Sequence, residues 1–405
     1  MLAPACIPDS PLQRAQRLLL VRLRSAGDIL LLTPALAALK QARPSLLLAL
    51  LVEERFAALL DGHPHLDCVL SLAKHRPPGR HHWTLMRRLR RFEFDLALDL
   101  HGGRRAALYT LLSGAKRRAG EARFRWSRSY HLRLSDSPPG CHTVEHTFHL
   151  LAALGLVARP GPLHAALPEA ARRRGELLAQ QAAAGSSYAV IQPTAARRTR
   201  RWESAKFAAV ARGLAERGRT VLVSSGPGEA AHASRVVEGA GHPRVRAVCP
   251  GDLAELAGLL SGADLFIGND SGPAHLAAAL ERPTVVIFGS SDPRRWGPWS
   301  ERGAPLWRAL SCSPCRGRSC ARPAAEQLLC LREIGPGAVL AAALALLQAR
   351  DAGAIEPVAQ QRELLGQDAG AAHQMRDRDR QIDNDPDQKN EAEREQSVRR
   401  HLDAD

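Results

Sequence analysis

A chain of 405 residues is long enough for two domains, and this one carries 56 lysines and arginines against 41 acidic residues, a net charge of +15. Residues 351–405 contain 14 acidic and 8 basic residues, so the first 350 residues hold a net charge of +21. Such a basic body favours nucleic acid, anionic lipid or a phosphorylated small molecule as its partner. Aromatic residues make up only 4%, which disfavours a surface that stacks bases.

The sequence shows no secretory signal and no run of about 18 apolar residues, so neither export nor a membrane span is expected. Four cysteines, Cys6, Cys68, Cys141 and Cys249, are scattered along the chain, as reduced thiols are. The expected compartment is therefore the cytoplasm.

Residues 1–16 are expected to form a loose leader, after which apolar strands alternate with helical patterns. The expected strands are 18–23, 46–52, 68–72 and 94–100, and the expected helices are 29–40, 53–60 and 104–112. This alternation predicts a parallel sheet that is covered on both faces. Pro160-Gly161-Pro162 punctuates the series, so we place a first domain over residues 17–165.

A second series predicts another doubly wound domain over residues 166–350. Its expected strands are 188–192, 220–224, 264–267 and 283–288, and its expected helices are 170–182, 203–217, 229–238, 252–260 and 274–280. Ligands of such sheets bind beyond the carboxyl ends of the strands, which predicts a site in a cleft between the two domains. Residues 351–405 are polar and poor in large apolar groups, so we expect a disordered tail.

The most informative segment, residues 263–282, reads as a strand, a turn of small residues and a helix whose first turn contains Pro273. The free N–H groups and the positive end of such a helix attract an anion. Ser271 and Gly272 let a phosphate approach, and His275 can donate a hydrogen bond to it. The alternative is a plain strand–helix connection in which Ser or Asp caps the helix.

Asp28 follows the first strand in the segment Arg24–Asp28 and precedes an apolar helix. A carboxylate at this turn can accept the proton of an attacking hydroxyl and so act as a general base. The alternative, which the sequence alone favours, is an aspartate that caps the helix.

The loop after the strand at 188–192 carries four arginines: Arg197, Arg198, Arg200 and Arg201. Guanidinium groups pair with phosphates, so the loop could bind a diphosphate. The alternative is a run of charge that is simply solvated. Glu229 follows the strand at 220–224 and can accept hydrogen bonds from a ribose, or simply begin a helix. In the first domain, Gly102 and Arg104 follow a strand end and can reach the cleft.

The last four cysteines form a cluster whose spacing permits a structural zinc, with free thiols as the alternative: Cys312, Cys315, Cys320 and Cys330. His142 and His146 have the HxxxH spacing of a metal pair, but no third ligand is apparent. A helix-capping role is therefore expected for this segment.

Four segments in this order resemble the glycosyltransferase family 9 heptosyltransferases, from about Arg17 to about Leu347: VRLRSAGDILLLTPALAALK; FDLALDLHGG; RRWESAKFA with SSGPGE; and IGNDSGPAHLAAAL followed by PTVVIFGSSDPRRWGP. The resemblance implies a GT-B fold, in which two Rossmann-like domains bind the acceptor (N-terminal) and the nucleotide sugar (C-terminal). It further implies inverting, metal-independent transfer of heptose from ADP-L-glycero-D-manno-heptose to the inner core of lipopolysaccharide, without a cofactor.

In this family resemblance Asp28 corresponds to the catalytic base, and Gly27 lets the acceptor approach. Thr194 lies in the loop that closes on the phosphates, and Arg200 stands where members usually carry lysine. The implied donor-binding residues are Thr194, Arg200, Glu229, Asp270, Ser271, Gly272 and His275. The expected acceptor-binding residues are Ser25, Gly27, Gly102 and Arg104.

The implied partners are ADP-heptose and a phosphorylated Kdo-lipid A or core oligosaccharide. The basic N-terminal half is expected to be drawn to the anionic inner face of the inner membrane, so that the protein is peripheral there. A different nucleotide-sugar enzyme of the same architecture, such as an epimerase, is the alternative. A nucleic-acid-binding protein is a remote one, because no binding module is recognisable.

Overall fold

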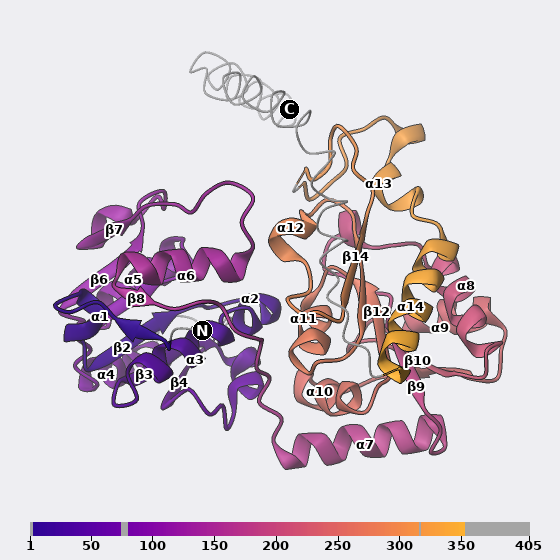
Figure 1. Cartoon of the computed structure of the whole chain (residues 1–405), viewed down its shortest axis with the longest axis horizontal. Coiled ribbons are helices and arrows are strands. Elements are labelled where there is room, and N and C mark those ends of the chain that lie inside the picture. The colour runs from indigo at the N-terminus through magenta and orange to yellow at the C-terminus, as the bar shows by residue number, and fades with distance from the viewer. Residues whose placement is uncertain (1–2, 74–79, 316, 353–405) are drawn as a thin grey trace, which may run out of the picture. The chain divides into compact units, whose positions relative to one another are not determined.

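Two parallel sheets of six strands each dominate the described part of the chain, which comprises residues 3–73, 80–315 and 317–352 of a computed structural model (Figure 1). The strand order is β4-β3-β2-β5-β6-β7 in the N-terminal sheet and β11-β10-β9-β12-β13-β14 in the C-terminal sheet. Every strand pair within these two sheets is parallel. The expected α/β class is confirmed.

The N-terminal sheet owes its strands to short apolar runs. They are β2 (Arg17–Val21), β3 (Leu47–Glu53), β4 (Cys68–Leu72), β5 (Leu96–Asp99), β6 (Arg117–Glu121) and β7 (Leu132–Leu134). Alternate residues of β2 face opposite ways. Leu18 and Leu20 join a core with helices α3 (Thr33–Ala42) and α6 (Thr143–Ala153). Leu19 and Val21 join one with α4 (Arg80–Arg91) and α5 (Arg104–Leu112), so both faces are covered.

The C-terminal sheet repeats this plan. Its strands are β9 (Tyr188–Gln192), β10 (Thr220–Ser224), β11 (Val245–Val248), β12 (Leu265–Asn269), β13 (Thr284–Phe288) and β14 (Gly303–Trp307). One face packs on α8 (Ser204–Ala215), α9 (Ala230–Ala240) and α14 (Pro336–Asp351). The other packs on α10 (Leu253–Ser261) and α11 (Gly272–Ala279). The remaining helices of the described chain are α1 (Pro11–Arg14), α2 (Ala26–Leu30), α7 (Glu169–Ala183), α12 (Pro293–Trp296) and α13 (Leu329–Arg332), with 3-10 turns η1 (Glu54–Leu60), η2 (Ser127–Ser129), η3 (Arg198–Arg200) and η4 (Ala324–Glu326).

The expectation of a loose leader over residues 1–16 is wrong for the residues that the structure describes. Ala5–Cys6 forms β1, which pairs antiparallel with β8 (Leu156–Val157). Leu12 and Ala15 are fully buried in the N-terminal core. Because β1 pairs with a segment about 150 residues away, local sequence could not reveal it.

The expected single helix over residues 29–40 is two helices, α2 and α3, and Pro34 lies in the first turn of the second. Proline is well tolerated there because it has no N–H to donate. The helix expected over residues 53–60 is the tighter 3-10 helix η1, which begins at Glu54 because Glu53 ends β3. Both differences change local geometry and leave the sheet intact.

One helical stretch, Ala324–Asp351, is long and apolar enough to cross a membrane by length and composition alone. The core helix of a soluble protein passes the same test, which makes this weak evidence. Val339, Ala343 and Leu347 of this stretch are buried in the C-terminal core. Of the apolar 18-residue window in this stretch, 28% is buried.

The expected domain boundary at 165/166 falls between β8 and α7, in a segment without helix or strand. The division into domains stays a prediction. Asp351 ends α14, and the tail expected to be disordered lies outside the described residues from position 353 onward.

Candidate active site

Asp28 lies in the first turn of α2, shortly after the carboxyl end of β2. Ser25, at the N-cap, donates its backbone N–H and its hydroxyl to Oδ2 of Asp28, at 2.7 and 3.0 Å. The other carboxylate oxygen accepts a hydrogen bond from Nη2 of Arg22 at 2.6 Å, and each side chain of this pair is less than one-fifth exposed. The N-cap of α2 is Ser25, so the alternative of an N-cap aspartate is wrong. Asp28 closes a capping box from the first turn and also forms an ion pair that capping does not need.

The charge of Arg22 keeps Asp28 ionised. Burial alone would raise the pKa of the carboxyl, but Arg22 and the hydrogen bonds from Ser25 and Arg22 outweigh it, so the pKa lies below its ordinary 3.8. Burial, then Arg22 and Arg24, lowers the pKa of the nearby His101 to about 4. At neutral pH the site therefore contains an aspartate that is ready to accept a proton, beside a neutral imidazole.

Helix α11 of the C-terminal half packs against α2 of the N-terminal half. A β-carbon built on Gly27 would lie 2.4 Å from Cδ2 of His275, and one built on Gly272 would lie 3.0 Å from Cβ of Ala26. Glycine at these two positions is what permits so close an approach. The contact brings His275 beside the turn that carries Asp28.

The polar atoms near this contact are incompletely paired. His275 is only 5% exposed, and its Nδ1 is buried without a hydrogen-bond partner in the described chain. The same holds for Nε of Arg22, Nε of Arg200 and Oε1 of Gln192. Buried polar atoms are nearly always paired in folded proteins, so several unpaired ones at neighbouring strand ends indicate a polar ligand.

Asp270 follows β12, and its buried carboxylate pairs with Nη1 of Arg200 at 2.9 Å. Ser291, from the loop after β13, donates its hydroxyl to the same oxygen of Asp270. Two expected donor-site residues that are 70 positions apart thus meet directly. The pair fixes the arginine-rich loop against the turn that begins α11.

The N-terminus of α11 is not capped by the side chain of Ser271. Its hydroxyl donates to the carbonyl of Asn269 at 3.1 Å and accepts nothing from the helix amides. The capping alternative for this serine is therefore wrong. The amides of the first turn and the positive end of the helix dipole are suited to an anion.

Thr194 and Glu229 are also in contact. The threonine hydroxyl donates to Oε2 of Glu229 at 2.8 Å and accepts from Nε2 of Gln192 at 2.8 Å. Glu229 precedes α9 without capping it. One carboxylate oxygen of Glu229 is therefore occupied by Thr194, which orients the group at the carboxyl end of β10.

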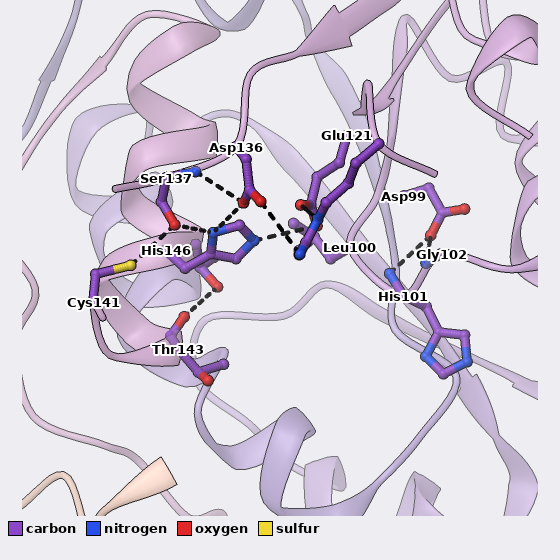
Figure 2. Close-up of polar contacts among 12 residues, drawn as sticks. Asp99, Leu100, His101, Gly102, Glu121, Asp136, Ser137, Cys141, Thr143 and His146 are labelled. Atoms are coloured by element: carbon purple, nitrogen blue, oxygen red, sulfur yellow. Dashed lines mark hydrogen bonds and ion pairs between the residues drawn. The ribbon is translucent and has the colours of Figure 1, made fainter. Parts of the chain in front are cut away.

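The loop after β5 carries the expected acceptor residues Gly102 and Arg104. The buried carboxylate of Asp99 accepts the backbone amides of His101 and Gly102 at 2.8 and 2.9 Å, as Figure 2 shows. Gly102 has φ +69°, and a β-carbon there would lie 2.6 Å from the ring of Phe124, so only glycine fits without strain. Arg104, the first residue of α5, is exposed.

A polar cluster next to this loop joins β6 to α6 (Figure 2). Nε2 of His146 lies 3.2 Å from Oε1 of Glu121, and its Nδ1 shares a hydrogen bond of 2.6 Å with the hydroxyl of Ser137. Arg123 donates to Glu121 at 2.5 Å and lies 3.3 Å from Asp136. Glu121, Asp136 and His146 are the one group among the described residues with the geometry of a metal site. The guanidinium of Arg123 already provides a positive charge beside the carboxylates of Glu121 and Asp136.

His142 caps α6, as expected for the HxxxH segment, because its ring accepts the backbone N–H of Val144. It also forms a hydrogen bond through Nε2 with the carbonyl of Gly297, 3.1 Å away. Thr143 donates to the carbonyl of Arg295 at 2.9 Å. The start of α6 is therefore a second contact between the two halves of the described chain.

The four clustered cysteines line one cavity in the C-terminal half, together with Arg322 and Thr199. Nε of Arg322 donates to Sγ of Cys312 at 3.1 Å. No three cysteine sulfurs in the described chain lie within 4.8 Å of one another. This geometry does not support the zinc alternative over free thiols.

Sequence reasoning missed Arg22, Gln192 and Ser291, which contact the expected residues Asp28, Thr194 and Asp270. Arg22 lies one residue beyond the end of β2 and therefore reaches the same sheet edge as Asp28. That position was a usable signal. Ser291 lies in the quoted segment PTVVIFGSSDPRRWGP, but nothing local connects it to Asp270.

A family model described as glycosyltransferase family 9 (heptosyltransferase) matches residues 82–325. Lipopolysaccharide heptosyltransferase 3 of Escherichia coli is 30% identical over 302 residues, which cover 70% of this chain and 87% of the relative. Lipopolysaccharide heptosyltransferase 1 of Pseudomonas aeruginosa is 30% identical over 326 residues, covering 77% and 89%.

Solved structures give the same fold. A family 9 glycosyltransferase of Veillonella parvula superposes with a TM-score of 0.71 at 22% identity, covering 82% of this chain and 97% of the other. An Escherichia coli heptosyltransferase solved with ADP has a TM-score of 0.61 at 25% identity, covering 72% and 92%.

Proposed function

The chain belongs to glycosyltransferase family 9, the heptosyltransferases, and from that premise we propose an inverting, metal-independent transfer with Asp28 as the base. The protein is a glycosyltransferase of lipopolysaccharide core biosynthesis, which moves heptose. The observation that carries the proposal is the ionised Asp28, held by Arg22 beside the contact of α2 with α11.

In the proposed step, Asp28 accepts the proton of an acceptor hydroxyl as the hydroxyl oxygen attacks the anomeric carbon of the donor heptose. The new glycosidic C–O bond forms on the face opposite the leaving group. The bond from the anomeric carbon to the diphosphate oxygen breaks, and ADP leaves with that electron pair. Attack from the opposite face inverts the anomeric configuration, so no covalent intermediate with the protein is needed.

Groups of the C-terminal half stabilise the negative charge that develops on the departing diphosphate. The first-turn amides of α11 with Ser271 and Gly272, the imidazole of His275, and Arg200 supply donors there. Donors that are already oriented by the fold cost little reorganisation when the bond breaks. These groups take the electrostatic role that a metal ion fills in other transferases, which supports the metal-independent mechanism.

The proposed donor is ADP-L-glycero-D-manno-heptose, with its ribose at Glu229 and its phosphates near Thr194, Arg200 and Asp270. The proposed acceptor is a phosphorylated Kdo-lipid A or core oligosaccharide, bound along Ser25, Gly27, Gly102 and Arg104. Such a substrate places the enzyme in the cytoplasm, peripherally on the anionic inner face of the inner membrane, with no nucleic acid involved.

The test is ADP release from ADP-heptose, with and without a heptose-deficient core acceptor. We expect release that depends on the acceptor and persists in excess EDTA. Proton NMR of the product should show the anomeric configuration opposite to that of the donor. Retained configuration or loss of activity with EDTA would refute the mechanism, and release from another nucleotide sugar only would refute the donor.

A further inference from the structure

Helices α4 and α5 form the layer on one face of the N-terminal sheet, and large apolar side chains are exposed on it. Seven large apolar side chains are substantially exposed in the described chain, and four of them lie on or beside this layer: Trp83, Leu108, Leu111 and Trp126. Trp83 is 58% exposed, and the two leucines are 47% and 46% exposed. Apolar side chains gathered in this way mark an interaction surface.

The periodicity of α5 shows that this exposure is systematic. Arg104, Leu108 and Leu111 are exposed and follow the i, i+4, i+7 spacing of one helix face, whereas Ala106 and Tyr109 are buried against the sheet. This exposed face of α5 begins at the loop that carries the expected acceptor residues. It therefore extends for about two helical turns from the end of β5 where those residues lie.

The charge of the same surface is of one sign. Residues 80–92 and 102–118 contain no aspartate or glutamate. On α4, Arg87, Arg88 and Arg91 are exposed and form no ion pair with a described residue, and the guanidinium of Arg87 lies over the ring of Trp83, 4.8 Å from its centroid. By contrast, Arg172 and Arg173 on α7 are paired with Glu169.

Both helices are anchored by their opposite faces. Leu85 and Leu89 of α4 and Tyr109 of α5 are buried in the core that these helices share with β2 and β3. Helices α4 and α5 also contact each other. The exposed surface is therefore a fixed feature of the fold, with tryptophan, leucine and arginine side chains on one layer.

We propose that the exposed layer of α4 and α5 docks on an anionic phospholipid bilayer, with Trp83, Leu108 and Leu111 entering the interface and Arg87, Arg88 and Arg91 contacting headgroup phosphates. Arginine on an apolar-faced helix and tryptophan at the water boundary are what such an interface selects. The inference rests on the proposed lipid-linked acceptor, and it assigns the contact to a surface of the fold. Diffuse attraction of the whole basic body does not require these particular residues.

The test is sedimentation of the full chain with vesicles of phosphatidylcholine containing phosphatidylglycerol, and with pure phosphatidylcholine, over a series of salt concentrations. We compare the wild type with two double variants. One combines Leu108→Asp and Leu111→Asp, and the other combines Arg87→Gln and Arg91→Gln. Leu177→Asp is the matched control, because Leu177 is 55% exposed on α7, outside the layer. Thermal unfolding of each variant checks that it is folded.

We expect binding that requires the anionic lipid and weakens with salt. Loss of the two arginines should lower the partition coefficient about 30-fold, since each contributes roughly a factor of five near such a surface. The leucine pair should remove the binding that persists in high salt, and Leu177→Asp should change nothing. Equal binding of all variants, or no preference of the wild type for anionic vesicles at low salt, would overturn the proposal.

A second readout separates this proposal from the proposed function. Both pair variants should transfer heptose to a water-soluble, delipidated acceptor at the wild-type rate and lose transfer to the same acceptor embedded in vesicles. Failure of transfer by the wild type on every acceptor would count against the proposed function and leave the vesicle result standing. An equal loss on both acceptors would count against the docking surface.

Discussion

The imidazole of His275 occupies the space beside Gly27 that a larger residue would need, with Cδ2 only 2.4 Å from the position of a β-carbon. Gly27 precedes Asp28 in α2, and His275 lies in α11, so this contact joins the proposed base to the proposed diphosphate site. The structural relationship predicts that the two sides of the reaction are sensitive to a single methyl group.

Gly27→Ala should therefore displace α2 from α11 or force His275 out of its position. We expect the free energy of unfolding to fall by about 1–3 kcal/mol, the usual cost of overpacking, and kcat/KM to fall with it. Thermal unfolding and ADP release measure the two effects. Gly161→Ala is the control, because a β-carbon there would meet nothing within 4 Å. Unchanged activity in Gly27→Ala would show that the contact is not needed.

Asp28→Asn keeps the shape of the side chain and an oxygen that can accept from Ser25, but it removes the base. Acceptor-dependent ADP release should fall about 100- to 10,000-fold, the usual contribution of a positioned general base. Asp61→Asn, at an exposed loop position, should leave the rate unchanged. A loss of only a few-fold in a folded Asp28→Asn variant would exclude Asp28 as the base.

Arg22→Gln should change the pH profile. Burial raises the pKa of Asp28, and the charge of Arg22 contributes to the net lowering; without it the pKa rises. Because only the ionised carboxylate accepts a proton, the acidic limb of the kcat/KM profile should move to higher pH. The kcat/KM of Arg22→Gln should therefore come closest to that of the wild type at alkaline pH. Arg22→Lys should restore most of the original profile.

The control for this profile is Arg24→Gln, since Arg24 is exposed and Arg22, not Arg24, is the main positive charge that lowers the pKa of Asp28. Its acidic limb should stay in place. A rate that falls by the same factor at every pH in Arg22→Gln would mean that Arg22 acts by position alone.

Arg200→Ala should weaken donor binding. It removes a charge-assisted contact to the diphosphate and also the ion pair with the buried Asp270, which keeps its hydrogen bond from Ser291. Such a contact is worth about 1.5–3 kcal/mol, which corresponds to a rise of about 10- to 100-fold in the KM for the donor. Arg198→Ala changes an exposed neighbour outside the ion pair of Arg200 with Asp270 and should bind the donor normally. Steady-state kinetics with varied donor would decide, and equal KM values would argue against Arg200.

Glu121→Gln should destabilise the N-terminal half at neutral pH by about 1–2 kcal/mol, because it removes the charge of a buried carboxylate from its ion pair with Arg123, which is 45% exposed and therefore partly screened by solvent. Burial raises the pKa of Glu121, but the hydrogen bonds and charges of His146 and Arg123 outweigh it, so the pKa lies below its ordinary 4.5. The stabilisation is therefore complete above pH 4.5 and is lost as the pH falls through the lowered pKa. The difference from wild type should vanish in acid, whereas the exposed Glu301→Gln should show none at any pH.

Much of the fold could be predicted from local sequence patterns. The expected strands 68–72, 188–192 and 220–224 and the expected helix 104–112 agree with β4, β9, β10 and α5 at both ends. These segments are uniformly apolar or strictly periodic, so their pattern has one interpretation. The motifs around Asp28 and Asp270 were also visible, because a strand followed by a small-residue turn and a helix is a local feature.

Other elements were not legible. β6 reads RRAGE and is recognisable as a strand only through its partners β5 and β7. Helix α4 was not among the expected helices, although its Leu85 and Leu89 are buried. Polar or strongly charged segments carry weak periodicity, and pairing or burial then decides their structure.

Local sequence was sufficient for two alternating α/β halves and for the turns that end their strands, because backbone propensity and hydrophobic period act over a few residues. The meeting of Asp270 with Arg200 and Ser291 and the packing of Gly27 on His275 depend on which strand ends and helices the fold brings together. Those contacts join residues up to 248 positions apart and set charge and burial at the site. Only the folded chain supplies them, because electrostatic and packing energies depend on distance in space.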